Sequence, residues 1–277
     1  MDLGALRYRE SCYVAPWENS RGSIVLIHGV AECGKAWIPC VPWLSRYHRV
    51  VIPDLPGCGK SQIPQPMTWS LEFLAELMAE FIGGLFSAPI HLVGSKFGGT
   101  LALCISARRP DLVQSLTVLD LHIASHSNTG TKTAREAIRR QGLRRWAADT
   151  MNARLGSAAS SVKLRWWTDY MASADMETTL SMMSAIDGVD LEQMVRKVTA
   201  PTLLVASGRS PIATSIDAER WAGLMADATV HFVDGDAYHS AAAYPDLVAR
   251  RISNFIDQHS AVEERPHGSG AAAGSIT

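Results

Sequence analysis

The sequence lacks the features of a secreted, membrane-spanning or polyanion-binding protein. No uninterrupted apolar run approaches the ~18 residues that a spanning helix requires. The first residues, Met1-Asp2-Leu3-Gly4, do not show the charged-then-apolar order of a signal peptide. The formal net charge is only −1, so the chain carries no excess of positive charge for a nucleic acid or an anionic membrane. We therefore expect a cytoplasmic protein that binds a small molecule and neither nucleic acid nor membrane.

Cysteine is scarce and irregularly spaced. The five cysteines are an odd number without a Cys-x-x-Cys pair, which favours reduced thiols over disulfides or a zinc site.

A nucleotide-binding loop is also missing. The stretch Gly57–Ser61 resembles the end of one, but the motif needs a glycine five positions before Gly59, where Asp54 stands. We expect no metal and no cofactor, and we interpret this stretch as a glycine-rich turn after a strand.

Short apolar runs alternate with helical patterns over most of the chain. Apolar residues make up 47% of the sequence, which is enough for a sizeable core. The predicted strands are Ser23–His28, Arg49–Pro53, Ile90–Val93, Leu116–Asp120, Thr202–Ala206 and Thr229–Val233. Helical periodicity lies between and after them, as over 70–86 and 245–259. This order predicts an α/β fold whose mostly parallel central sheet carries helices on both faces.

The alternation is interrupted between about His122 and Lys197. Only helical patterns occur there, together with several tryptophan and methionine residues. We predict a helical cap over 122–197, inserted into a core formed by 1–121 and 198–260. The last residues, 261–277, are rich in glycine, alanine and serine and are predicted to be a disordered tail.

The stretch Gly94–Gly99 is the most informative in the chain. A predicted strand leads into it and a helix leads out, as in the sharp strand–turn–helix motif that presents a catalytic nucleophile. The glycines at 94 and 98 place Lys96 at the tip of this turn, where the motif has a serine. Ser95 falls one position early. We therefore predict an intact elbow with a lysine in place of the nucleophile.

Five motifs occur together in a familiar order. They are His28-Gly29, Pro53–Ser61, Gly94–Gly99, Pro201–Val205 and Gly235–His239. From about Gly22 to Asp257 the chain resembles the α/β-hydrolase superfamily, in particular capped members such as enol-lactonases and carbon–carbon bond hydrolases. The resemblance implies the α/β-hydrolase fold with a helical cap and a triad in the order nucleophile, acid, histidine. It implies less about the reaction, because the chemistry depends on the site.

The resemblance also implies roles for single residues. His239 follows the last predicted strand, where the family has its catalytic histidine. The loop in which the acid commonly lies has no carboxylate here and carries Ser210 instead. Asp120, which ends the strand after the elbow helix, is therefore the candidate that orients His239. Glu32 lies near the first motif; we expect it at the surface, and the alternative is that it faces the same space as the oxyanion hole.

The resemblance further implies an oxyanion hole made of backbone amides. The amide of Phe97 and that of Val30 or Ala31 should form it. Ligand sites are mostly apolar, so we expect apolar side chains of the cap and of the loops around it to cover the pocket. We expect these to be Trp146, Trp167 and Tyr238.

A lysine at the elbow cannot repeat the acyl transfer of serine, because its attack on an ester leaves a stable amide. It can form a Schiff base if burial and the helix N-terminus lower its pKa. Alternatively, it can hold a carboxylate or enolate as a cation while His239 moves protons.

These options predict a cofactor-independent hydrolase or lyase. It would cleave a carbon–carbon or ester/lactone bond of a small carbonyl compound through Lys96, and a homodimer is compatible with this interpretation. The alternative is a non-catalytic binding protein or pseudoenzyme on the same fold.

Overall fold

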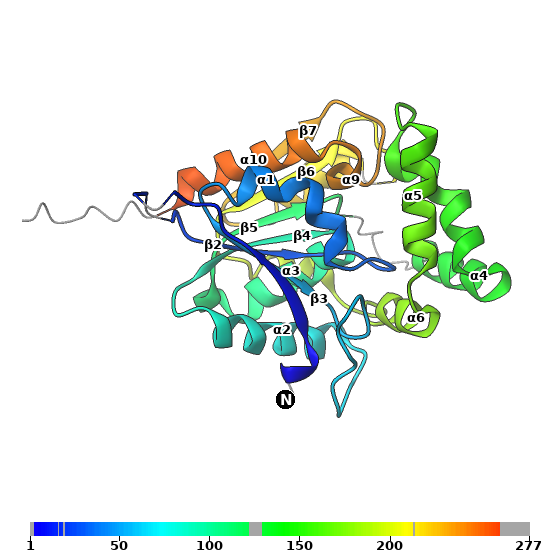
Figure 1. The fold of residues 1–277 in the computed structure, drawn as a ribbon, viewed down its shortest axis with the longest axis horizontal. Helices are drawn as coiled ribbons and strands as arrows, with labels where there is room; N and C mark the ends of the chain where they lie inside the picture. Colours follow the sequence, from blue (N-terminus) through cyan, green and yellow to red (C-terminus); the bar gives the residue numbers. More distant parts are fainter. Residues whose placement is uncertain (1–2, 16, 19, 122–128, 213, 261–277) are drawn as a thin grey trace, which may run out of the picture.

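A seven-stranded sheet in the order β1-β3-β2-β4-β5-β6-β7 forms the centre of the molecule (Figure 1). The structure, a computed structural model, describes residues 3–15, 17–18, 20–121, 129–212 and 214–260. β1 pairs antiparallel with β3, and every other neighbouring pair in the sheet is parallel. The predicted α/β architecture with a mostly parallel sheet is thereby confirmed.

The described elements follow the predicted alternation. The strands are β1 (Arg7–Ser11), β2 (Ser23–Ile27), β3 (Arg49–Asp54), β4 (Ile90–Ser95), β5 (Val113–Leu119), β6 (Thr202–Ser207) and β7 (Ala228–Val233). The α-helices are α1 (Val41–Leu44), α2 (Leu71–Leu85), α3 (Phe97–Arg108), α4 (Thr129–Leu155), α5 (Ser161–Ala172), α6 (Met176–Ser184), α7 (Leu191–Val195), α8 (Ser215–Ala222), α9 (Ser240–Ala243) and α10 (Pro245–His259). The edge strand β1 was not predicted, because its charged and mostly exposed residues lack an apolar pattern.

Side chains of the strands divide the core into two layers. In β2, Val25 and Ile27 pack with side chains of α2 and α3, whereas Ile24 and Leu26 pack with those of α1 and α10. Successive strand residues point to opposite faces of a sheet. Figure 1 shows α2 and α3 below the sheet and α1 and α10 above it. Because both faces are covered, the central strands form continuous apolar runs rather than alternating ones.

The helices α4, α5, α6 and α7 lie between β5 and β6 in the chain. Figure 1 shows α4, α5 and α6 together beside the sheet, with α9 next to α5. Their apolar side chains share a cluster with Ala31, Ala36 and Ala242, which belong to the segments after β2 and β7. The division into a core and a cap over 122–197 stays a prediction. Residues 122–128 and the predicted tail, 261–277, lie outside the described residues.

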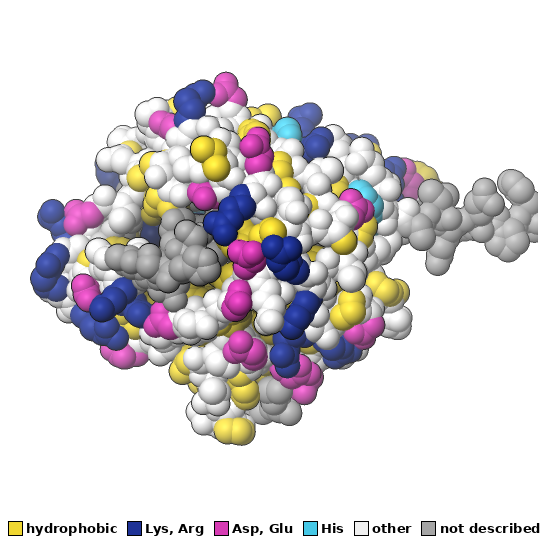
Figure 2. Space-filling model, turned by 180° about the vertical axis from the view of Figure 1, so that it is seen from behind, with side chains coloured by type: hydrophobic (Ala, Val, Ile, Leu, Met, Phe, Trp, Pro, Cys, Tyr) yellow, Lys and Arg dark blue, Asp and Glu magenta, His cyan; other side chains and the backbone are white. Residues whose placement is uncertain are grey.

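Charged side chains of both signs are interspersed on the face seen in Figure 2. That face therefore shows no broad region of one sign, in keeping with the formal net charge of −1. Among the helices that the structure describes, none has the length and apolar character needed to cross a bilayer.

The elbow between β4 and α3 is packed so closely that only glycine fits at two positions. A Cβ at Gly94 would collide with the carbonyl group of Gly98, and one at Gly98 would collide with the carbonyl groups of Ile27 and His28. These neighbours are backbone atoms, which cannot rotate away as a flexible side chain can. The turn thus depends on both glycines.

We predict that Gly98→Ala lowers the free energy of unfolding by about 3 kcal/mol, because the added methyl group is forced against β2. Urea unfolding measures the effect. Gly84→Ala is the matched control, since a Cβ at Gly84 in α2 meets nothing within 4 Å. It should stabilise the helix by about 0.5–1 kcal/mol. Equal unfolding energies for the two variants would contradict this packing.

Candidate active site

Four polar side chains come together from loops at one edge of the sheet. Glu32 lies beyond β2, Lys96 follows β4, Asp120 follows β5, and His239 lies beyond β7. These strands are parallel, so their carboxyl ends lie at the same edge, where ligands of open α/β sheets commonly bind. The fold thus gathers residues that are far apart in the sequence.

Lys96 occupies the tip of the elbow in a conformation that is rare for a residue with a side chain. Its φ is 54° and its ψ is −115°. Such a backbone costs about 1–3 kcal/mol and needs support from its surroundings. Support comes from its amide, which donates to the carbonyl of Leu119 at 2.9 Å. The side chain is 14% exposed and lines a cavity of about 460 Å³. We call this cavity the elbow cavity.

The carboxylate of Glu32 is the centre of the polar network. Oε2 accepts a hydrogen bond from the amide of Gly29 at 3.1 Å. Oε1 lies 3.1 Å from Nζ of Lys96 and 2.9 Å from Nε2 of His239. The contact with Lys96 is an ion pair without hydrogen-bond alignment. The expectation that Glu32 lies at the surface is wrong: the residue is 3% exposed, because the loop after β2 turns it inward.

His239 is a neutral hydrogen-bond donor in this arrangement. Its Nδ1 accepts from the amide of Ala242 at 3.2 Å, so the ring proton belongs on Nε2, which donates to Glu32. Burial and the charge of Lys96 hold the pKa of His239 well below its usual value. Both ring nitrogens are therefore engaged, and neither has a free lone pair to take a proton.

Asp120 does not orient His239, so that prediction is wrong. Its Oδ2 accepts from the amide of Ser240 at 2.6 Å and from the Ser240 hydroxyl at 2.8 Å. The His239 imidazole caps the N-terminus of the short helix α9 by accepting from the amide of Ala242. The next residue, Ser240, donates to the Asp120 carboxylate instead. Oδ1 of Asp120 is buried without a hydrogen-bond partner, and the residue lines the elbow cavity with Lys96. Asp120 is thus near the lysine rather than behind the histidine.

Burial and neighbouring charges set the protonation of these groups. Burial lowers the pKa of Lys96 to about 8, although the Glu32 carboxylate opposes the shift. Burial raises the pKa of Asp120 to about 6, against the two hydrogen bonds from Ser240. Burial alone would raise the pKa of Glu32, but the nearby Lys96, His239 and His28 together outweigh burial and lower the value to about 2. At neutral pH, Glu32 is ionised and a minority of Lys96 is a free amine.

The other predicted site residues divide between two cavities. Val30, Phe97, Trp146 and Tyr238 line the elbow cavity, whereas Ala31 lines a second cavity that also contains Glu32. Trp167 packs against His239 instead, with 5.2 Å between the ring centroids. The backbone oxyanion hole stays a prediction.

Arg154 on α4 is a site residue that the sequence did not single out. It is 6% exposed and lines the elbow cavity. Its Nε donates to the Thr150 hydroxyl at 3.0 Å, and its guanidinium carbon lies 4.7 Å from the Trp146 ring and 5.1 Å from the Tyr238 ring. It has no ion pair with any residue that the structure describes. Helical periodicity alone did not show which of several arginines faces inward.

Comparison with known proteins agrees with this architecture. The profile of the family described as alpha/beta hydrolase fold matches residues 22–243. The chain belongs to the α/β-hydrolase family. Within the described residues, no three His, Cys, Asp or Glu side chains are placed to hold a metal ion.

Several hydrolases are similar to the chain. A RutD protein of Stutzerimonas stutzeri, a carbamate hydrolase by name, is 28% identical over 199 residues, which are 67% of this chain and 72% of that protein. The 2-hydroxy-6-oxo-2,4-heptadienoate hydrolase of Pseudomonas putida is 33% identical over 99 residues, 35% of this chain and 36% of that protein. The enol-lactonase of Burkholderia xenovorans superposes with a TM-score of 0.81 at 22% identity, covering 91% of this chain and 96% of that one. The last likeness concerns the fold alone.

We predict that Glu32→Gln lowers the pKa of Lys96 below its value of about 8, because the carboxylate charge raises that pKa. The rate of labelling by an amine-reactive reagent, followed against pH with peptide mass spectrometry, measures the shift. Glu192→Gln is the control, since this carboxylate pairs only with Arg196 and Arg220 at the surface among the described residues. An unchanged labelling profile in Glu32→Gln would show that the ion pair does not govern the lysine.

Proposed function

We propose that this α/β-hydrolase-family protein is an enzyme that cleaves a carbon–carbon bond next to the carbonyl group of a small keto acid, with Lys96 as the reacting amine. The observation that carries the proposal is Lys96 at the elbow tip, whose side chain is only 14% exposed and whose pKa is lowered to about 8. An amine with that pKa is partly neutral at physiological pH, as Schiff-base formation requires.

The histidine's arrangement supports amine chemistry over hydrolysis by a triad. A triad needs an imidazole lone pair that takes the proton of a hydroxyl or of water. In His239 the amide of Ala242 occupies Nδ1, and the Nε2 proton is donated to Glu32. The elbow tip carries no hydroxyl. The site thus lacks both the free imidazole base and the hydroxyl nucleophile of ester or lactone hydrolysis. We therefore favour cleavage of a carbon–carbon bond.

The proposed reaction begins when the neutral amine of Lys96 attacks the carbonyl carbon and water leaves. In the resulting iminium ion, the bond between the α-carbon and the neighbouring carboxylate breaks, its electron pair forms an enamine, and carbon dioxide leaves. Protonation at the α-carbon and hydrolysis of the imine then release the ketone and restore the amine. Asp120 can carry protons in these steps, because it lines the same cavity and its pKa of about 6 suits exchange near neutral pH.

The environment of Arg154 favours a carboxylic acid as the substrate. A guanidinium that is buried without an ion pair is costly unless a ligand supplies the counter-charge. Arg154 meets this description within the described residues and lines the elbow cavity with Lys96. If the carboxylate of the substrate binds Arg154, its carbonyl group can face Lys96 in the same cavity. The name of the Pseudomonas putida relative, a heptadienoate hydrolase, also describes an oxo acid as substrate.

One observation favours a ligand-binding protein as the second candidate. Both oxygens of Glu32 and both nitrogens of His239 are engaged within the protein, as in a structural network. A binding protein needs only the elbow cavity and its cations. Saturable binding of keto acids without turnover and without an adduct would favour this candidate.

We predict that sodium borohydride traps acetoacetate or oxaloacetate on Lys96, seen as a mass increase on its peptide. Turnover should rise with pH through an inflection near 8, because the reactive amine forms as the pH passes the pKa of Lys96. Lys96→Arg keeps the charge but forms no imine, and should lower kcat by about 10³-fold or more. Lys132→Arg, at an exposed position, is the control. Full activity in Lys96→Arg would sink the proposal.

We also predict negligible turnover of p-nitrophenyl acetate. The amine of Lys96 should take up a single acetyl group as an amide, which hydrolyses far more slowly than an acyl-serine ester. Intact-mass and peptide analysis after long incubation measures the modification. Sustained turnover, or labelling of Ser95 by a fluorophosphonate probe, would contradict the assignment of Lys96 as the elbow's reacting group.

A further inference from the structure

Glu32 lines a second cavity, which has a volume of about 390 Å³. Its lining includes Arg9 of β1, Lys35 and Lys60, together with Tyr170 of α5 and Thr178 and Thr179 of α6. We call it the basic cavity, after Arg9, Lys35 and Lys60. Glu32 lines the basic cavity, while its ion-pair partner Lys96 lines the elbow cavity, so the ion pair stands between the two.

Among the residues that the structure describes, no carboxylate is in ion-pair contact with the three cations of the basic cavity. None of Arg9, Lys35 and Lys60 forms an ion pair within the described residues. In addition, Nε of Arg9 is buried without a hydrogen-bond partner. A buried guanidinium nitrogen that lacks an acceptor is unusual, because native structures satisfy most buried polar groups.

The carboxylates around this cavity are already engaged by donors. Glu32 holds Lys96 and His239. Asp54 accepts from the amides of Gly34 at 2.7 Å and Lys60 at 2.9 Å. Asp175 accepts from the amide at the start of α6, at 2.7 Å. These carboxylates therefore do not supply the acceptor that Arg9 lacks.

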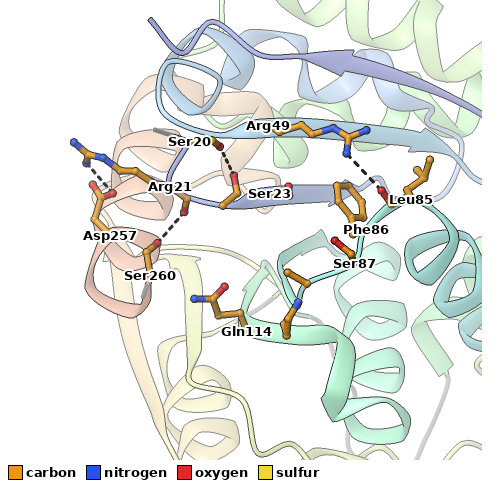
Figure 3. A pocket seen from close by; sticks show the side chains of 13 residues that line it. Ser20, Arg21, Ser23, Arg49, Leu85, Phe86, Ser87, Gln114, Asp257 and Ser260 are labelled. Carbon is orange, nitrogen blue, oxygen red and sulfur yellow. Dashed lines mark hydrogen bonds and ion pairs between the residues drawn. The ribbon is translucent and has the colours of Figure 1, made fainter. Parts of the chain in front are cut away.

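A third cavity shows the opposite arrangement. It has a volume of about 830 Å³ and includes Arg21, Arg49 and Asp257 in its lining (Figure 3). There Arg21 pairs with Asp257 at 3.0 Å, and Arg49 pairs with Glu10 at 2.7 Å. Figure 3 shows the Arg21–Asp257 pair at one end of the cavity and Arg49 along its upper wall. Both arginines of this larger cavity have ion-pair partners within the protein. The presence of a cavity therefore does not by itself explain why Arg9, Lys35 and Lys60 have none among the described residues.

We propose that the basic cavity binds a small oxyanion, a carboxylate or a phosphate, between Arg9, Lys35 and Lys60. A guanidinium group presents donors in a planar fork that matches such anions, and two ammonium groups add charge without fixed geometry. The site is separate from Arg154 and Lys96, and it does not depend on the reaction proposed for the elbow cavity. An anion bound in this cavity would lie near Glu32, whose charge raises the pKa of Lys96.

The test titrates inorganic phosphate or succinate into the full-length protein at constant ionic strength, with amide resonances followed by NMR. Saturable shifts are expected at Cys33, Gly57, Gly59 and Lys60. The double variant Lys35→Ala/Lys60→Ala should weaken binding at least tenfold. Both side chains are exposed, so the variant should fold normally. The control Arg46→Ala/Lys197→Ala removes the same charge elsewhere and should change affinity less than twofold.

Arg154→Met separates the two cavities. Binding in the basic cavity should persist in this variant with less than a twofold change. Stronger binding of phosphate than of succinate would identify a phosphate site, and the reverse order a carboxylate site. The proposal is overturned if Lys35→Ala/Lys60→Ala binds as tightly as the native protein. It is likewise overturned if Arg154→Met abolishes binding, or if sodium chloride alone produces the same shifts.

Discussion

The buried carboxylate of Glu32 is the charge on which the rest of the site depends. Removing a carboxylate from water costs several kcal/mol unless donors surround it. Here the amide of Gly29, the Lys96 ammonium and the His239 imidazole fill that role. Glu32 thereby lies within ion-pair distance of Nζ of Lys96 and accepts the proton that the Ala242 contact leaves on Nε2 of His239. The protonation of Lys96 and that of His239 are therefore both coupled to the Glu32 carboxylate.

Helix α5 holds the two flanks of this network in place. Trp167 packs on the His239 ring, and one helical turn away the Tyr170 hydroxyl meets the backbone of Cys33, next to Glu32. The hydroxyl accepts from the Cys33 amide at 2.6 Å and donates to its carbonyl at 2.9 Å. Residues three apart share one face of a helix. A single helix face thus supports both the donor and the acceptor of the His239–Glu32 hydrogen bond.

Local sequence predicted the sheet and the elbow well, because both are specified by neighbouring residues. Apolar runs identified six of the seven strands, and the Gly94 and Gly98 positions located the turn at Lys96. The partners of His239 and Asp120 were not predictable in this way. Glu32 reaches His239 across 207 positions of sequence, and Asp120 meets Ser240 across 120. Such pairings depend on how a loop turns after its strand, which no periodic pattern encodes.

The orientation of His239 changes what this scaffold can do. His239 accepts from Ala242 at Nδ1 and donates its Nε2 proton to Glu32, so in the proposed reaction another group carries the protons. Asp120 is suited to that task, because its buried Oδ1 has no partner and it shares the cavity with Lys96. Its pKa of about 6 and that of Lys96 at about 8 lie on either side of neutrality. The two values lie closer together than those of a free lysine and a free aspartic acid, which lowers the free-energy cost of moving a proton between the groups. In the reaction proposed for the elbow cavity, acid–base chemistry thus falls to Lys96 and Asp120, which β4 and β5 place at the ends of adjacent strands.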